Sequence, residues 1–240
     1  MSRLPEAKDN TVSSFFDHLD ELRARFIKSI LAFFVAACSS YAFAGHFLGI
    51  LARPVGKLIF TSPADAFMAQ VTLSLWAGLF LAFPVILYQI WQFVCVGLTE
   101  KERRYVLVFG PLSFILFFSG AAFGYFAMIP ISLKFLLGFS SDFIVPMIEI
   151  KNYISFVGTF VLAFGIVFEL PLILMFLTKI GIATPAFLAQ KRRHAIILIL
   201  IVSAILTPPD VISQILMALP LMVLYEISIW LSRLTYRERG

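Results

Sequence analysis

A glutamate inside an apolar run is the residue whose chemistry is most informative. Glu169 is the only charged residue between Phe156 and Leu177. Counted along a helix, it lies about 20 Å from one end of that run and about 12 Å from the other. A carboxyl group at that depth in a bilayer costs roughly 2.5–3.5 kcal/mol and favours its neutral form. Pro171 removes a hydrogen bond to the Val167 carbonyl, so the sequence predicts a kink beside a buried, functional carboxyl group.

Two further acids stand at expected helix starts. Glu21 lies in HLDELRARF, where the helix dipole stabilises an anion and Arg25 is in reach at i+4. Thr99 and Glu102 have the spacing of a capping box. Both acids therefore have a structural explanation. If the first and third helices are neighbours, however, the two carboxylates converge near one membrane surface. There they would hold one or two guanidinium groups through charge-assisted, bidentate bonds.

The composition is that of a polytopic helical membrane protein. Of the 240 residues, 60% are hydrophobic and only 14% are charged. The cysteines and histidines occur singly, so we expect neither a metal nor a cofactor. The net charge of +5 belongs to the flanks of membrane spans and does not indicate a nucleic-acid partner. No protease signature lies within the apolar runs, and we expect no enzymatic activity.

Six apolar runs divide one integral-membrane domain over residues 1–240. The predicted spans are residues 26–47, 67–96, 105–129, 153–177, 194–207 and 211–231. The fifth is about 21 Å long, against a hydrocarbon core of about 30 Å, so it ends short of one interface, thins the bilayer or forms a re-entrant helix. Residues 1–23 read as a cytoplasmic arm, because they lack the basic region and apolar core of a signal peptide. Residues 233–240 form a cytoplasmic tail.

The distribution of basic residues predicts the orientation. All but four of the 19 lysines and arginines fall on the side of the two termini. The exceptions are Arg53, Lys57, Lys134 and Lys151. The positive-inside rule therefore places both termini in the cytoplasm.

Prolines and glycines shape the predicted helices. We expect residues 48–66 and 130–152 to form interfacial helices or caps on the outside, and residues 207–210 (TPPD) to form a stiff hairpin. Prolines within or at the ends of spans favour kinked helices that enclose a cup-like shape; they are Pro84, Pro111, Pro130, Pro171 and Pro220. Gly120 and Gly124 form a GxxxG pattern that permits close helix packing.

These residues together resemble the TatC family, the multi-spanning core of the twin-arginine protein translocase. The resemblance covers nearly the whole chain from His18 to Arg233. It is carried by residues 18–26 (HLDELRARF), Pro54, 83–104 (FPVILYQIWQFVCVGLTEKERR), 155–171 (SFVGTFVLAFGIVFELP) and 206–220 (LTPPDVISQILMALP). Six spans, both termini inside, and shortened fifth and sixth helices are also similar to that family.

The resemblance implies a receptor for signal peptides with two consecutive arginines, carried by proteins that are exported folded. Glu21 and Glu102 match the family's two arginine-recognising acids. Arg23 matches an arginine of its N-terminal region, and Phe93 an aromatic residue at the end of the second helix. Pro54 matches a proline of the first outside loop.

The resemblance also implies assembly within the plasma (inner) membrane. Glu169 matches the family's buried glutamate, and Asp210 and Gln214 match polar residues at the start of the sixth helix. Together with Thr207 they are expected to bind single-span partners of the TatA and TatB types. Export driven by the proton motive force, contact with lipid and self-association of the receptor complete the expectation. One departure is Val96, which stands where the family commonly has a proline before Gly97-Leu98, so the geometry of this loop is open.

Two other classes of function remain open from the residues. A proton-coupled small-molecule transporter would use Glu169 as its proton site, but the sequence offers neither internal repeats nor a second buried charged partner on another helix. A structural membrane scaffold would leave the acids with only their local roles.

Overall fold

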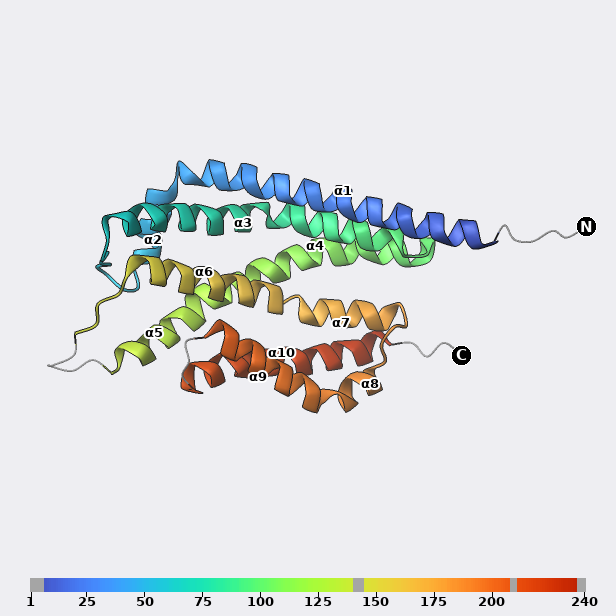
Figure 1. The fold of residues 1–240 in the computed structure, drawn as a ribbon. Coiled ribbons are helices and arrows are strands. Elements are labelled where there is room, and N and C mark those ends of the chain that lie inside the picture. Colours follow the sequence, from blue (N-terminus) through green and yellow to red (C-terminus); the bar gives the residue numbers. More distant parts are fainter. Residues whose placement is uncertain (1–6, 140–144, 208–210, 237–240) are drawn as a thin grey trace, which may run out of the picture.

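The protein is an all-helical bundle (Figure 1) in a computed structural model that describes residues 7–139, 145–207 and 211–236. The elements in order are α1 (Ala7–Tyr41), α2 (Ala44–Ala52), α3 (Pro63–Val96), α4 (Glu100–Phe123), a π-helical turn η1 (Gly124–Met128), α5 (Ile129–Leu137), α6 (Ile150–Val167), α7 (Leu170–Lys179), α8 (Pro185–Gln190), α9 (Arg192–Leu206) and α10 (Val211–Thr235). Within the described ranges, extended pairing is limited to one isolated bridge, between Ile59 and Glu149. The predicted all-α class is confirmed.

The first predicted span is longer and more bent than expected. α1 runs unbroken from Ala7, so most of the predicted arm over residues 1–23 is helical and continuous with the span. Charged and polar residues do not end a helix, and no glycine or proline interrupts the chain from Ala7 to Tyr41. After Tyr41 the chain turns by 78° into α2. Residues 48–66 thus begin within a short helix, as predicted.

The second span is close to its predicted bounds. Ser62 caps α3 together with Asp65 in a capping box, with Pro63 in the first turn. The helix continues through Pro84 to Val96 and packs along α1 (Figure 1).

The third span extends past its predicted end. α4, η1 and α5 together form a helical segment, Glu102–Leu137, that is long and apolar enough to cross a membrane. Pro130 was expected to begin an outside segment. Instead it lies in the first turn of α5, directly after the π-helical turn, where the local change of hydrogen-bond register accommodates a residue without an N–H. Residues 130–137 are thus helical, as expected for a segment of short helices or caps, and this helix is continuous with α4 through η1.

The fourth span is interrupted where the sequence predicted a kink. α6 ends at Val167, α7 begins at Leu170, and Phe168 and Glu169 form the joint between them. Pro171 lies in the first turn of α7. A proline is tolerated there because helix N-termini carry unpaired N–H groups in any case.

The last two predicted spans differ in length. α9 has 15 residues, about 22 Å, which agrees with the predicted short fifth span. α10 has 25 residues, about 37 Å, so the expectation of a short sixth helix is wrong. It continues to Thr235, and the predicted tail over 233–240 thus begins inside the helix.

Four described segments are long and apolar enough to cross a membrane, and α1 with α2 makes a fifth if the bent pair is one span. α9 is too short to be counted among them. The fold is that of a multi-pass membrane protein, while the number six stays a prediction.

The interior is built where α4 crosses α6 (Figure 1). A side chain at Gly120 would overlap Phe164 and Phe168, and one at Gly124 would press on Phe164. The GxxxG pattern therefore serves contact between two helices of one chain, and Phe117, Phe160 and Phe164 fill the adjoining core.

Candidate functional site

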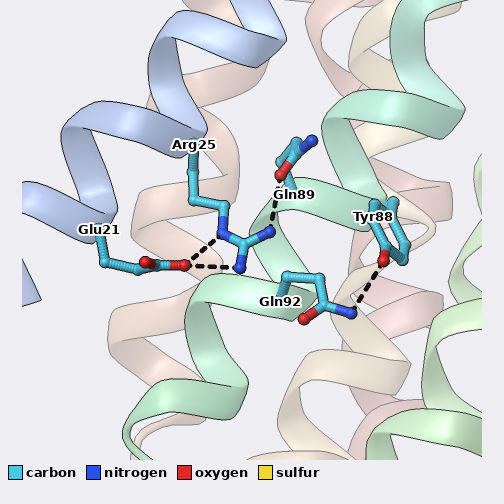
Figure 2. A network of polar contacts seen from close by, with 5 residues as sticks. All are labelled: Glu21, Arg25, Tyr88, Gln89 and Gln92. Atoms are coloured by element: carbon cyan, nitrogen blue, oxygen red, sulfur yellow. Dashed lines mark hydrogen bonds and ion pairs between the residues drawn. The ribbon is translucent and has the colours of Figure 1, made fainter.

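The carboxylate of Glu21 is bound by an arginine one helical turn away. Arg25 Nε donates to Glu21 Oε1 at 2.7 Å, and Arg25 Nη2 lies 2.5 Å from the same oxygen. Arg25 Nη1 donates to Gln89 Oε1 on α3 at 3.0 Å, so the guanidinium joins two helices (Figure 2). The side chain of Glu21 remains 34% exposed and that of Arg25 21% exposed. Glu21 is thus a partly exposed carboxylate that holds a guanidinium, as the i, i+4 spacing predicted.

Glu102 forms the predicted capping box at the start of α4. Its Oε2 accepts bonds from the backbone N–H of Thr99 at 3.1 Å and from the Thr99 hydroxyl group at 2.8 Å. Figure 1 shows the α3–α4 turn beside the N-terminal half of α1, so the segments that carry Glu21 and Glu102 lie at the same end of the bundle. The capping role and a location at the helix start are both confirmed.

Phe93 and Arg23 occupy different surroundings at this end. The Phe93 ring packs against His18, with ring centroids 4.5 Å apart. Phe93 also lines a groove of about 410 Å³ between α1 and α3, together with Arg25, Gln89 and apolar side chains of both helices. Arg23 is exposed. The groove therefore begins at the Glu21–Arg25 pair and continues along apolar surface.

Glu169 is buried at the joint between α6 and α7. Its side chain is 5% exposed, and its Oε1 atom has no hydrogen-bond partner among the described residues. The hydroxyl group of Ser113 on α4 interacts with the carboxyl group, and Ser113 Oγ also accepts a 3.0 Å bond from Trp91 Nε1 on α3. A small polar cluster from three spans thus surrounds Glu169 on one side only.

The polar residues predicted near the outside end of α9 and α10 have internal partners. The buried Thr207 hydroxyl group donates to the Ser203 carbonyl at 2.8 Å. Gln214 Nε2 donates to the Leu200 carbonyl at 3.0 Å and so ties α10 to α9. Asp210 lies outside the described residues. The predicted hairpin itself falls largely on residues 208–210, which lie outside the described residues.

Pro54 lies in the exposed turn that follows α2. The N–H groups of Val55 and Gly56 both donate to the Ala52 carbonyl, at 3.1 and 2.8 Å. Gly56 has a φ of 77°, which closes the turn in the left-handed region. The segment that follows this turn is fixed to the segment before α6, because Ile59 exchanges backbone bonds with Ile148 and Ile150.

Two hydrogen-bond partners were not foreseen from the sequence, namely Gln89 for Arg25 and Ser113 for Trp91. Gln89 and Ser113 are polar residues within apolar runs, which is the signal that could have singled them out. An exposed ion pair between Arg192 and Glu226, 2.8 Å long, also joins α9 to α10. Among the described residues, no cluster of three or more histidine, cysteine, aspartate or glutamate side chains is placed to hold a metal ion.

Comparison with known proteins places these residues in a family. The family model described as "Sec-independent protein translocase protein (TatC)" matches residues 17–220. A TatC protein of Desulforapulum autotrophicum is 43% identical over 93% of this chain and 85% of its own length. One of Carboxydothermus hydrogenoformans is 42% identical over 92% and 93%.

Solved structures agree with the sequence comparison. A crystal structure of the twin-arginine translocase receptor TatC superposes with a TM-score of 0.85 at 42% identity, over 92% of this chain and all of that one. With a family match over most of its length and relatives well above 30% identity, the chain belongs to the TatC family of Sec-independent protein translocase proteins.

Proposed function

We propose that this chain is the receptor subunit of a twin-arginine translocase, which binds the signal peptides of folded proteins at the plasma membrane. The observation that carries the proposal is the Glu21 carboxylate, which already holds a guanidinium group at a partly exposed helix start. This carboxylate accepts a hydrogen bond from the Nε atom of an arginine and forms an ion pair with its Nη2 atom. The arginines of such a peptide require a contact of this kind. Its partial exposure gives an affinity that is modest and sensitive to salt.

Glu102 is the second acid of the proposed site. Its capping bonds to Thr99 fix the carboxylate at the start of α4, near the end of the bundle where Glu21 lies. The positive-inside rule assigns this end, with both termini, to the cytoplasm. Arg23 and Phe93 flank the site, and the apolar part of the peptide would follow the groove that Phe93 lines.

Assembly with single-span TatA- and TatB-type partners is the proposed role of the membrane-embedded polar residues. A buried carboxyl oxygen without a partner is costly, and a polar side chain on a partner helix would satisfy Glu169 Oε1. Thr207, Asp210 and Gln214 would extend the docking region at the outside end. The receptor carries out no catalysis in this proposal: export draws on the proton motive force, and several receptor copies associate within one complex.

The test is binding of a labelled twin-arginine peptide to the chain in lipid nanodiscs. Glu21→Gln and Glu102→Gln should each abolish binding, because an amide keeps the size of the side chain but loses its charge. Glu226→Gln is the matched control, since Glu226 is an exposed acid that pairs with Arg192. Unchanged affinity in both Glu21→Gln and Glu102→Gln would refute the arginine-reading assignment.

A further inference from the structure

The guanidinium of Arg25 occupies the position that the proposed ligand needs. Two of its nitrogen atoms contact Glu21 Oε1, and a third donates to Gln89 Oε1 (Figure 2). The chemical group at Glu21 is therefore the same as the one on the peptide. The chain supplies it from its own helix, at a fixed spacing of four residues.

We propose that Arg25 is an internal competitor for Glu21: an arginine of the signal peptide binds Glu21 by displacing Arg25, and Gln89 retains the displaced guanidinium. This inference rests on the function proposed above. Gln89 can retain the displaced guanidinium because its side chain is buried, uncharged and already bound to Arg25 Nη1. Arg25 therefore leaves Glu21 without losing every partner, and no buried amide oxygen is left unsatisfied.

Internal competition lowers the affinity of every ligand of Glu21 by the same factor, so a ligand that binds weakly does not occupy the site. When one arginine replaces Arg25, a guanidinium contact is exchanged for another of the same kind, and little free energy is gained. A peptide with two arginines gains from its second contact, which Glu102 offers. A lysine ammonium has no planar fork, so it gives up contacts when it replaces Arg25. Arg25 thus sets the minimum binding free energy that a ligand needs in order to occupy Glu21.

In a purely structural role, Arg25 would only link α1 to α3 through its hydrogen bond to Gln89. That role and the competitor role predict opposite changes in peptide affinity. If only this link between the helices matters, loss of Arg25 makes the packing of α1 on α3 less rigid and weakens peptide binding. If Arg25 competes, its loss frees Glu21 and strengthens binding.

The experiment compares twin-arginine and twin-lysine peptides on the full chain in nanodiscs. Arg25→Leu keeps the apolar lining of the groove and should bind the twin-arginine peptide about two- to fivefold more tightly, the range expected from a partly exposed i, i+4 pair. The twin-lysine peptide should gain by the same factor, because Arg25 closes Glu21 to every ligand alike. Arg25→Lys should lie between wild type and Arg25→Leu. Gln89→Leu should change the affinity less than Arg25→Leu does, because Gln89 holds Arg25 both before and after displacement.

Lys28→Leu is the control for general electrostatics, since Lys28 is an exposed basic residue one turn further along α1. Equal tightening in Lys28→Leu and Arg25→Leu would overturn the proposal, because it would reduce the effect to net charge. Weaker binding in Arg25→Leu at an unchanged unfolding temperature would also overturn it.

A double mutant separates this inference from the receptor assignment. In a Glu21→Gln background, where the twin-arginine peptide no longer binds, Arg25→Leu should not restore binding, and restored binding would contradict competition at Glu21. If Glu21→Gln alone leaves wild-type binding intact, the assignment of Glu21 as a receptor residue fails as well. If Glu21→Gln abolishes binding while Arg25→Leu gives no gain, only the competitor role fails.

Discussion

Trp91 Nε1 donates a 3.0 Å hydrogen bond to Ser113 Oγ, and Ser113 in turn interacts with the carboxyl group of Glu169. Three spans, α3, α4 and the α6–α7 joint, therefore meet in one polar cluster inside an otherwise apolar interior. The cluster satisfies the indole N–H, yet leaves Glu169 Oε1 without a partner in the described structure. Mutation of Ser113 can therefore test the contribution of the cluster to stability, and mutation of Glu169 can test its proposed role in partner docking.

Ser113→Ala should lower the free energy of unfolding by about 1–3 kcal/mol, because it leaves the buried indole N–H of Trp91 unpaired. Thermal unfolding in detergent would measure the loss. Ser119→Ala on the same helix is the control, since the Ser119 hydroxyl group is exposed and bonds only to the Leu116 carbonyl. Equal unfolding temperatures for the two variants would show that the Trp91–Ser113 bond contributes nothing.

Glu169→Leu should keep the stability of the isolated chain or raise it by about 1 kcal/mol, because it removes a buried polar oxygen that has no partner. The same variant should lose cross-links to single-span partners and lose export. Glu169→Gln, which keeps a hydrogen-bonding side chain, should retain part of both. Normal cross-links and full export in Glu169→Leu would rule out the docking role, and loss of solute uptake instead would favour a transporter.

Gly78→Ala should separate α1 from α3, because a side chain at Gly78 would overlap the backbone of Ala37. Overpacking of this kind costs typically about 1–3 kcal/mol. Gly45→Ala in α2 is the control: its new methyl group would meet no atom within 4 Å, and alanine favours a helix by about 1 kcal/mol over glycine. The prediction is wrong if both variants unfold at the same temperature.

Tyr125→Phe and Tyr153→Phe should each loosen α2. Their hydroxyl groups donate to the Ile50 and Leu51 carbonyls at 3.2 and 2.8 Å, within the last turn of α2. Each bond contributes about 0.5–1.5 kcal/mol. Faster amide hydrogen exchange confined to α2 would check this, with Tyr88→Phe as the exposed control on α3. Exchange that is unchanged in α2 for both variants would contradict the prediction.

Local sequence rules recovered a large part of the fold and of the site. The Glu21–Arg25 pair and the Thr99–Glu102 box depend on spacings of three or four residues within one helix, which the sequence displays directly. The break beside Glu169 follows from Pro171, which cannot supply an N–H to the helix.

Contacts between distant segments were beyond such rules. Gln89 lies 64 residues from Arg25, and only the packing of α1 on α3 makes it an acceptor. The same holds for Ser113 beside Glu169. The extent of α1 was underestimated because apolar runs mark where a helix meets lipid, whereas a helix in water needs no such run. The continuity of α5 with α4 was not predicted, because Pro130 follows a π-helical turn that no sequence pattern indicates.

The Glu21–Arg25 pair also determines how long the carboxylate stays vacant. Side-chain rotamers at exposed positions change in picoseconds to nanoseconds, whereas a micromolar peptide with an ordinary association rate arrives about 0.1–10 times per second. Arg25 returns to Glu21 many times between two arrivals. Under the proposed function, an arriving peptide would therefore meet an ion pair without net charge for nearly all of that interval, and a departing peptide would leave a carboxylate that Arg25 occupies before the peptide could return.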